Sequence, residues 1–390
     1  MKSSIKSVWN PTIVVGLLGV LSAYYFGIVG SAWAVTGEFT RWGAHLMKMA
    51  GVDTSQYSYL ELIHFEKTPF TRPDGIMIFG MFVGAFIAAI LSNNIKLRFP
   101  TSKIRVAQAL IGGILAGFGA RLAMGCNLAA FFTGIPQFSL HTWYFTIASI
   151  IGTYIGTKII KLPIFQSKVK VRKVSKKFKS NQRLNDRNKL SLTIGIAVVL
   201  LVLLSIQSFK LGGIFPLLLV FGLIFGFLLE KGQVCFTSAF RDLWTVGRTQ
   251  MAKAIIIGMA LSTIGTFAFI QLGVVQKILW AGPNSLIGGL IFGIGIVIAG
   301  GCETGWMYRA VEGQVHYMIV GIGNVIGSIL VIVSWDKLAP LLTNETQKIN
   351  LLSTFGDYGG LTITYIGLML LFLFVLYYEK RYFAKSKKGI

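Results

Sequence analysis

Long runs of apolar residues alternate with short polar segments from one end of the chain to the other. About twenty consecutive apolar residues suffice to cross a membrane as an α-helix. The runs are continuous and do not alternate every second residue, which disfavours a β-barrel. The pattern therefore predicts an all-α polytopic membrane protein of about nine to ten transmembrane helices, with short broken or re-entrant helices. The predicted spans lie near residues 11–34, 76–91, 104–125, 141–160, 190–208, 214–229, 252–275, 285–301, 316–335 and 359–378.

Polar segments between the runs suggest which parts lie outside the membrane. Segments 36–74 and 336–359 are acidic or mixed in charge, so we predict that both face the exterior. The first of them contains the pattern of an amphipathic helix over 39–49. Two of the shorter spans, 76–91 and 285–301, could be broken or re-entrant. With ten spans, both termini lie on the inner side.

Composition supports a membrane protein, and the distribution of charge orients it. Of the 390 residues, 54% are hydrophobic and only 13% are charged, although the net charge is +23. Such a charge can indicate nucleic-acid binding, but here it is concentrated at 168–189 and 380–388, beside apolar runs. The positive-inside rule places such clusters in the cytoplasm, so no nucleic-acid partner is predicted and the protein is expected in a bacterial inner membrane. The expected division is a first membrane half over 1–164, a basic cytoplasmic linker over 165–189 and a second half over 190–390.

An internal repeat joins the two halves. Residues 112–126 match residues 288–302 at a constant offset of 176, the distance from Cys126 to Cys302. A weaker match relates 79–84 to 221–226. According to the predicted spans, the segments 112–126 and 288–302 cross the membrane in opposite directions, whereas 79–84 and 221–226 cross it in the same direction. One duplication cannot give both results. Repeats of this kind build transporters whose substrate site lies between the halves. The identical positions of the first unit are Gly112, Gly113, Gly117, Gly119, Ala123, Gly125 and Cys126.

Each repeat unit ends in a Gly-Cys junction followed by polar residues. Glycine permits a break in the helix, and the N-terminus of the next helix attracts anions and activates a nearby thiol. A soft sulfur in such a place suits a sulfur-containing anion. The alternative is that the cysteines are small buried apolar residues; two at equivalent places favour the functional interpretation. The junctions comprise Gly125, Cys126 and Asn127 in the first unit, and Gly301, Cys302, Glu303 and Thr304 in the second.

The third cysteine and several charged residues are further candidates. Cys235 follows a short span among polar residues, where it could line the cytoplasmic half of a pore or be an ordinary loop thiol. Charges at membrane depth are costly and usually face a cavity or a partner. Arg121 precedes the first junction, while Arg309 and Glu312 follow the second and could pair with each other. His141 and His316 are interpreted as residues that start spans, not as metal ligands.

Several classes of chemistry have no support in the sequence. Three cysteines without a CxxC spacing predict neither a disulfide framework nor a zinc site. There is no phosphate-binding glycine loop, no dinucleotide fingerprint and no HExxH motif. We therefore expect no metal, no cofactor and no enzymatic activity.

Three segments resemble the YeeE/YedE family of bacterial sulfur-compound transporters. They are 121–134, 232–242 and 299–313, which contain Met-Gly-Cys-Asn, Gln-Val-Cys-Phe and Gly-Gly-Cys-Glu. The resemblance implies uptake of thiosulfate, or of a related sulfur or selenium species, through an hourglass-shaped protein. It also implies that Cys126, Cys235 and Cys302 pass the anion inward by transient S–H···S contacts, and that a small TusA-type sulfur carrier can be the cytoplasmic partner.

Two hypotheses from other functional classes stay open at this point. One is a membrane sulfurtransferase, in which the Cys235 thiolate accepts sulfane sulfur and hands it to a carrier. The other is a scaffold subunit in which the thiols only pack.

Overall fold

Ten long helices make up most of the part of the chain that the structure describes. The structure, a computed structural model, describes residues 7–166, 179–343 and 346–387, and this part contains no β-strand. Each of the ten predicted spans falls on a different long helix, so the predicted fold class is confirmed. Nine helical stretches in the described part are long and apolar enough to cross a membrane, and α7, which is richer in threonine, is the tenth long helix. The long helices are α2 (Pro11–Val29), α5 (Pro73–Leu91), α6 (Lys103–Leu122), α7 (Leu140–Ile159), α8 (Lys179–Leu211), α9 (Phe215–Lys231), α11 (Gln250–Gln271), α12 (Pro283–Ala299), α14 (Val315–Leu342) and α16 (Asp357–Lys387).

Short helices fill the centre and one end of the bundle. The amphipathic helix expected at 39–49 is present as α3, which buries Phe39, Ala44 and Met47. His141 and His316 each lie one residue after the start of a long helix, as predicted. The short elements are α3 (Thr36–Met49), α4 (Ser58–Leu62), η1 (Asn127–Phe132), η2 (Ile135–Gln137), η3 (Pro163–Phe165), α10 (Phe236–Val246), α13 (Glu303–Val311) and α15 (Leu351–Phe355).

Some boundaries differ from the predictions. Helices α5 and α12 are continuous, and the breaks follow α6, α9 and α12 instead. The loop expected from Asp336 is helical as far as Leu342, because α4 covers this end of α14 and packs Tyr59 against Trp335 at 5.1 Å between ring centroids. Within the expected linker, α8 begins at Lys179, while residues 167–178 lie outside the described part.

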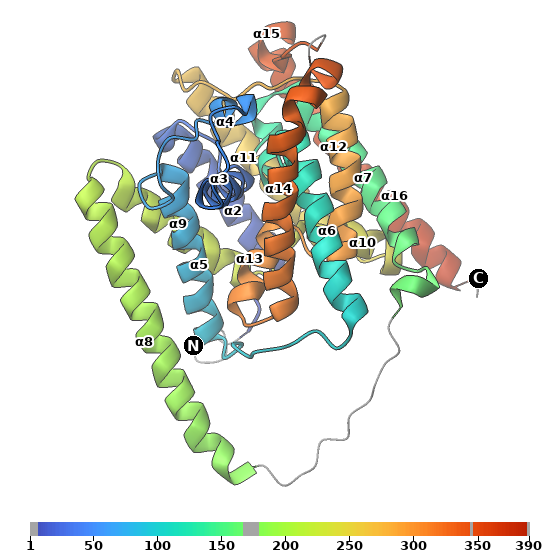
Figure 1. Cartoon of the computed structure of the whole chain (residues 1–390). Coiled ribbons are helices and arrows are strands. Elements are labelled where there is room, and N and C mark those ends of the chain that lie inside the picture. Colours follow the sequence, from blue (N-terminus) through green and yellow to red (C-terminus); the bar gives the residue numbers. More distant parts are fainter. Residues whose placement is uncertain (1–6, 167–178, 344–345, 388–390) are drawn as a thin grey trace.

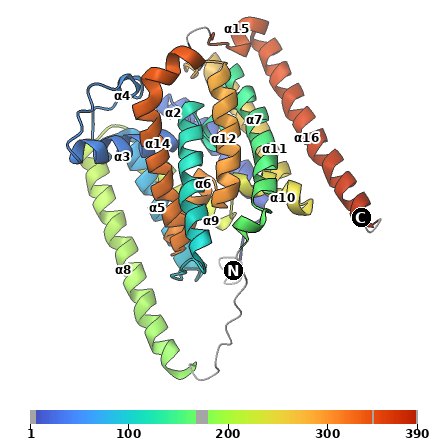
Figure 2. The same cartoon turned by 45° about the vertical axis from the view of Figure 1, so that its right-hand side comes forward.

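Figure 1 shows both chain ends at the lower end of the bundle, with α4 and α15 at the upper end. The positively charged loop between α5 and α6 also lies at the lower end, and the positive-inside rule therefore predicts that this end is cytoplasmic. Helix α8 contacts α5 and α9, but its lower part stands away from the other helices in both views, and its apolar stretch is largely exposed, as expected for a helix that faces lipid (Figures 1 and 2).

The two repeat helices pack against each other in opposite directions. A Cβ atom on Gly112, early in α6, would meet Ala299 at the end of α12 at 2.3 Å. A Cβ atom on Gly288, early in α12, would meet Ala123 just after α6 at 2.6 Å. The Gly-Cys units are therefore inverted, and their small residues let the two backbones touch.

The remaining helix pairs explain the conflict in the sequence repeat. Helices α5 and α9 run parallel, since Gly84 meets Leu223 and Gly226 meets Met81, and α2 and α11 also run parallel. Helix α6 contacts α14 as α12 contacts α7. All these contacts are preserved when α2 is exchanged with α9, α5 with α11, α6 with α12, and α7 with α14. The match of 79–84 to 221–226 therefore joins two helices that touch each other, α5 and α9, and are not repeat equivalents. The repeat equivalent of α9 is α2.

The close approach of α5 and α9 predicts a large effect on stability. A Cβ atom on Gly226 would lie 1.9 Å from the carbonyl oxygen of Met81, so leucine there must push the backbones apart. We expect Gly226→Leu to destabilise the protein by about 3 kcal/mol or more and to lower its melting temperature in detergent. Gly195→Leu is the matched control, because a Cβ atom at Gly195 meets nothing within 4 Å. Equal melting of the two variants would contradict the packing.

Candidate functional site

The three cysteines occupy the same position in three breaks between helices. Each lies two residues after a residue in the left-handed backbone region, with φ of 59°, 48° and 75° in chain order. The residue between the left-handed residue and the cysteine donates its N–H to the carbonyl five positions earlier, at 2.8, 3.0 and 3.1 Å. This hydrogen bond is the Schellman ending of a helix. The pairs are Met124 and Cys126, Gln233 and Cys235, and Gly300 and Cys302.

Each cysteine is also the N-cap of the short helix that follows. The Cys126 carbonyl accepts the N–H of Ala130 at 2.7 Å, and the Cys302 carbonyl accepts that of Trp306 at 2.9 Å. At η1 the sulfur itself caps the turn, accepting the N–H of Leu128 at 3.4 Å. First-turn N–H groups of a helix lack partners within it. The breaks therefore place each thiol among backbone donors.

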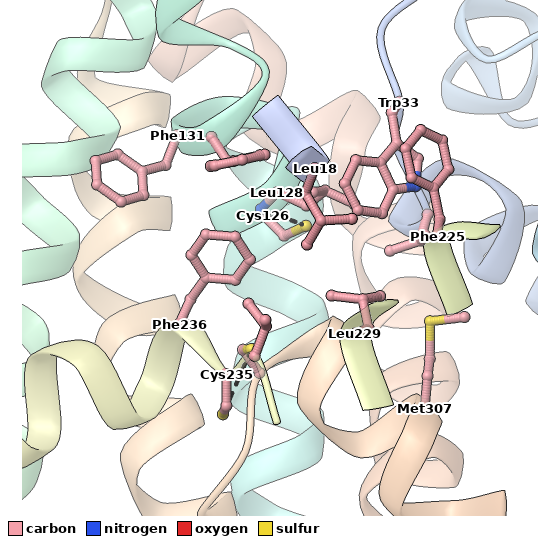
Figure 3. Close-up of a cluster of buried hydrophobic side chains, with 14 of the residues drawn as sticks. Leu18, Trp33, Cys126, Leu128, Phe131, Phe225, Leu229, Cys235, Phe236 and Met307 are labelled. Carbon is pink, nitrogen blue, oxygen red and sulfur yellow. Dashed lines mark hydrogen bonds between the residues drawn. The ribbon is translucent and has the colours of Figure 1, made fainter. Parts of the chain in front are cut away.

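Two of the thiols form a pair, and the third lies on another level. The sulfurs of Cys235 and Cys302 are 3.9 Å apart, and Thr304 Oγ1 lies 3.4 Å from the Cys302 sulfur. Cys126 lies apart from Cys235, beside Leu128 (Figure 3). All three side chains are buried, with exposures of 0% and 1%. Cys235 is therefore buried beside Cys302, although several of its neighbours in the chain are polar.

Aromatic and aliphatic groups separate the two levels of thiols. Phe236 and Leu229 lie between Cys126 and Cys235 in Figure 3, and Phe236 contacts Phe132 edge-on at 5.6 Å between ring centroids. Both residues belong to the buried apolar cluster that also contains the three cysteines. These side chains thus fill the space between the two levels of thiols.

The residues after Cys126 and Cys302 differ in chemistry although they are equivalent in the repeat. Asn127 is 2% exposed, and neither polar atom of its side chain has a hydrogen-bond partner in the described part. Glu303 accepts hydrogen bonds from Trp306 Nε1, at 2.9 Å, and from Asn324 Nδ2. Thr237 Oγ1, two residues after Cys235, is another buried atom without a partner. Orphaned polar atoms thus lie near both levels of thiols.

Glycines before two of the cysteines allow close packing. A Cβ atom on Gly125 would lie 2.7 Å from that of Ala130, and one on Gly301 would lie 2.8 Å from the Tyr317 ring. In the first unit, however, the left-handed residue is Met124 and not a glycine.

The ion pair expected between Arg309 and Glu312 is not formed. Arg309 instead donates to Tyr317 Oη at 2.7 Å and to the carbonyl of Gly300 at 3.3 Å. This contact directs its charge to the C-terminal end of α12, where the helix dipole favours a cation.

Glu312 instead supports the break before Cys235. Its carboxylate accepts the side-chain amides of Asn94 and Gln233, each at 3.1 Å, and of Gln314 at 2.6 Å. Gln233 is the left-handed residue of that break. Glu312 is thus a positioning residue for Cys235.

Arg121 lines an outer cavity that sequence reasoning did not find. The cavity has a volume of about 280 Å³, and its walls include Thr36, Arg41, Asp74, Arg121 and Lys277. Thr36 also lies beside the Cys126 thiol, so the cavity ends next to the first thiol. Burial, and next the charge of Arg121, hold the pKa of Lys277 below its ordinary range. The available signal was a lone lysine in the short loop between the spans predicted at 252–275 and 285–301, because external loops are usually poor in lysine and ten spans would place this loop outside.

The burial of the thiols predicts slow chemical labelling. We expect a maleimide reagent to modify the folded protein in detergent at least about ten times more slowly than the unfolded protein, because a thiolate must be exposed to react. Mass spectrometry of the intact protein would count the modified thiols. Rapid modification of any one thiol in the folded state would show that the central region is open.

Comparisons with known proteins place the chain among transporters. A family model described as sulphur transport matches residues 1–155 and 231–389. The chain is 56% identical over 383 residues to the probable transporter YedE of Escherichia coli K12, covering 97% of this chain and 94% of the relative. The YedE protein of Salmonella typhimurium LT2 is also 56% identical, over 382 residues and with the same coverage.

A more distant similarity concerns a transporter with a named cargo. The thiosulfate transporter TsuA of Escherichia coli K12 is 42% identical over 99 residues, which is 25% of this chain and 28% of that protein. The family match spans most of the sequence and the relatives are named transporters, in agreement with the helical membrane fold. The chain therefore belongs to the sulphur transport family and is a multi-pass membrane transporter of a sulfur compound.

Proposed function

We propose that the protein imports thiosulfate, or a closely related sulfur anion, across the bacterial inner membrane by way of its three cysteines. The observation that carries the proposal is the recurrence of one arrangement, in which a buried thiol caps a short helix after a left-handed break. Nothing in the packing of long helices requires a thiol at each break. The partial similarity to a thiosulfate transporter supports the choice of cargo.

The thiols suit an anion that carries a terminal sulfur. A thiol is a weak hydrogen-bond donor and a polarizable contact, so it can hold a sulfur atom without binding it tightly. Cys126 would receive the anion from the outer cavity. The Cys235–Cys302 pair would receive it next, after the phenylalanine side chains between the two levels have moved. No covalent step is required.

Negative charge in a buried path needs compensation. The first turn of α10 supplies backbone donors near the thiol pair, because the N–H of Thr237 lies close to the Cys302 sulfur and that of Ser238 close to the Cys235 sulfur. At the level of Cys126, the side-chain amide of Asn127 has no hydrogen-bond partner in the described part of the chain. These donors can replace part of the hydration shell of the anion.

A sulfurtransferase is the alternative from another class. It needs a carrier protein to reach the Cys235 sulfur, but this side chain is 1% exposed and packs beside Cys302. The burial favours transport. A persulfide found on Cys235 by mass spectrometry during uptake would support the transferase instead. A selenium species is the alternative cargo.

A TusA-like sulfur carrier is the proposed cytoplasmic partner, on the ground of the family resemblance. It would accept the cargo after release at the end where both termini lie. Cross-linking of a purified carrier to membranes that contain the protein tests this step, with membranes lacking the protein as the control.

The proposed cargo is tested by uptake of radiolabelled thiosulfate. A bacterial strain without its own thiosulfate and sulfate importers would carry either the gene or an empty vector, and selenite would be tested as competitor. Uptake above the vector that unlabelled thiosulfate suppresses supports the proposal. Equal uptake in both strains would reject thiosulfate as the cargo.

A further inference from the structure

The outer cavity contains more positive charge than its own acids neutralise. Arg41 forms ion pairs with Asp74 at 2.8 Å and Glu38 at 3.3 Å, and Arg72 pairs with Glu38 at 2.6 Å. The positive charges of these two arginines are balanced by the negative charges of the two carboxylates. The charges of Arg121 and Lys277 remain, and no ion pair reaches either of them in the described part of the chain.

Arg121 is an unusual group to leave unpaired. Its side chain is 6% exposed, its Nε atom has no hydrogen-bond partner in the described structure, and its guanidinium lies 5.4 Å from the centroid of the Tyr59 ring. The carboxylate of Glu303 lies near enough for the two charges to interact, but it is held by Trp306 and Asn324 and makes no ion pair with Arg121. A buried cation without a paired anion is costly, which indicates that a ligand supplies the missing charge.

The backbone at Lys277 is held at the cavity by hydrogen bonds. Its N–H donates to Gln137 Oε1 at 2.9 Å, and the N–H of Leu279 donates to Ser139 Oγ at 3.3 Å. These bonds attach the loop between α11 and α12 to the segment after η1 and so keep the lysine on the cavity wall. Two cations from separate elements therefore face one cavity with a net charge of +2.

We infer that Arg121 and Lys277 form a binding site for a divalent oxyanion at the outer end of the path, before the first thiol. This inference rests on the proposed function for its position but concerns different chemistry. A guanidinium and an ammonium recognise the charged oxygens of an anion, whereas thiols recognise its terminal sulfur. The outer site thus accepts sulfate as well as thiosulfate, and discrimination occurs at Cys126.

Binding of radiolabelled sulfate to the purified protein in lipid nanodiscs tests the site. We expect wild type to bind sulfate and unlabelled thiosulfate to displace it. Arg121→Gln and Lys277→Gln should each weaken sulfate binding at least about tenfold, since each removes one of two buried charge contacts. Arg121→Lys should restore part of the affinity. Lys348→Gln is the matched control, because Lys348 also lies at the outer end, over the Trp280 ring, but does not line the cavity.

The outcomes separate this site from the thiol path. Cys126→Ala should bind sulfate within about twofold of wild type, since only charge is read at the outer site. Absence of sulfate binding in wild type, or unchanged binding in Lys277→Gln, would overturn the inference. Loss of sulfate binding in Cys126→Ala would also overturn it, by placing the oxyanion at the thiol. If cysteine variants transported normally while the charge variants lost sulfate binding, the thiol path would be rejected and the oxyanion site retained.

Discussion

Alanine in place of Cys126 or Cys302 is expected to reduce thiosulfate uptake at least about tenfold, close to the level of cells that lack the protein. Cys126→Ala removes the S–H group from its level of the path, and Cys302→Ala leaves the Cys235 thiol without its partner, in a buried cluster that is mostly apolar. A lost contact worth about 1.4 kcal/mol in the rate-limiting step already gives a tenfold decrease. Initial rates of labelled thiosulfate uptake, divided by the amount of protein in the membrane, measure the effect.

The effect on stability should be small by comparison. Cys→Ala removes one buried heavy atom, which costs about 1 kcal/mol, so the variants should fold. Ser149→Ala is the matched control, because it removes a buried hydroxyl without a partner from α7. Cys126→Ser should keep more uptake than Cys126→Ala, since the hydroxyl still donates. Full uptake in both alanine variants would reject the cysteine path while leaving the family assignment intact.

Hydropathy alone predicted where the long helices lie, because the bilayer imposes one length and one chemistry on every span. It could not predict that α14 continues beyond Asp336. This end of α14 is covered by α4, which packs Tyr59 against Trp335 and places Ser58 so that it donates to Asp336. Contacts between segments far apart in the sequence decide such boundaries.

The repeat was visible in the sequence where glycines and a cysteine coincide, at 112–126 and 288–302. The second match failed because helices that pack through small residues carry similar glycine spacing whether or not they are equivalent. Gly84 and Gly226 lie in contacting helices of different repeat position. Composition could not separate these two causes of similarity.

The site was predicted in part. Sequence reasoning singled out all three thiols, but the pairing of Cys235 with Cys302 depends on how α10 and α13 approach each other in space. Two partners of Glu312, Asn94 and Gln233, likewise come from segments far away in the chain, and Arg309 binds Tyr317 of the next long helix, α14. Lys277 was overlooked because a single lysine in a loop has no local pattern.

Leucine in place of Glu303 is expected to cause the largest loss of stability among substitutions near the thiols. The Glu303 carboxylate is the acceptor for Trp306 Nε1 and Asn324 Nδ2, and the side chain is 2% exposed. Leucine would leave both donors buried without an acceptor, at about 1–3 kcal/mol each. We expect a clearly lower melting temperature in detergent, together with loss of uptake.

Glu303→Gln separates the hydrogen bonds from the charge. The glutamine oxygen can still accept from Trp306, and its amide can donate to Asn324 Oδ1, which has no partner in the described structure, once the Asn324 side chain turns over. The variant should therefore melt within a few degrees of wild type. If it is stable and transports, Glu303 acts only as an acceptor that positions α13 beside Cys302. If it is stable but does not transport, the negative charge beside the thiols is itself required, because the hydrogen bonds have been kept. A melting temperature as low as that of Glu303→Leu would contradict the role assigned to Trp306 and Asn324, since an acceptor and a donor remain available to them.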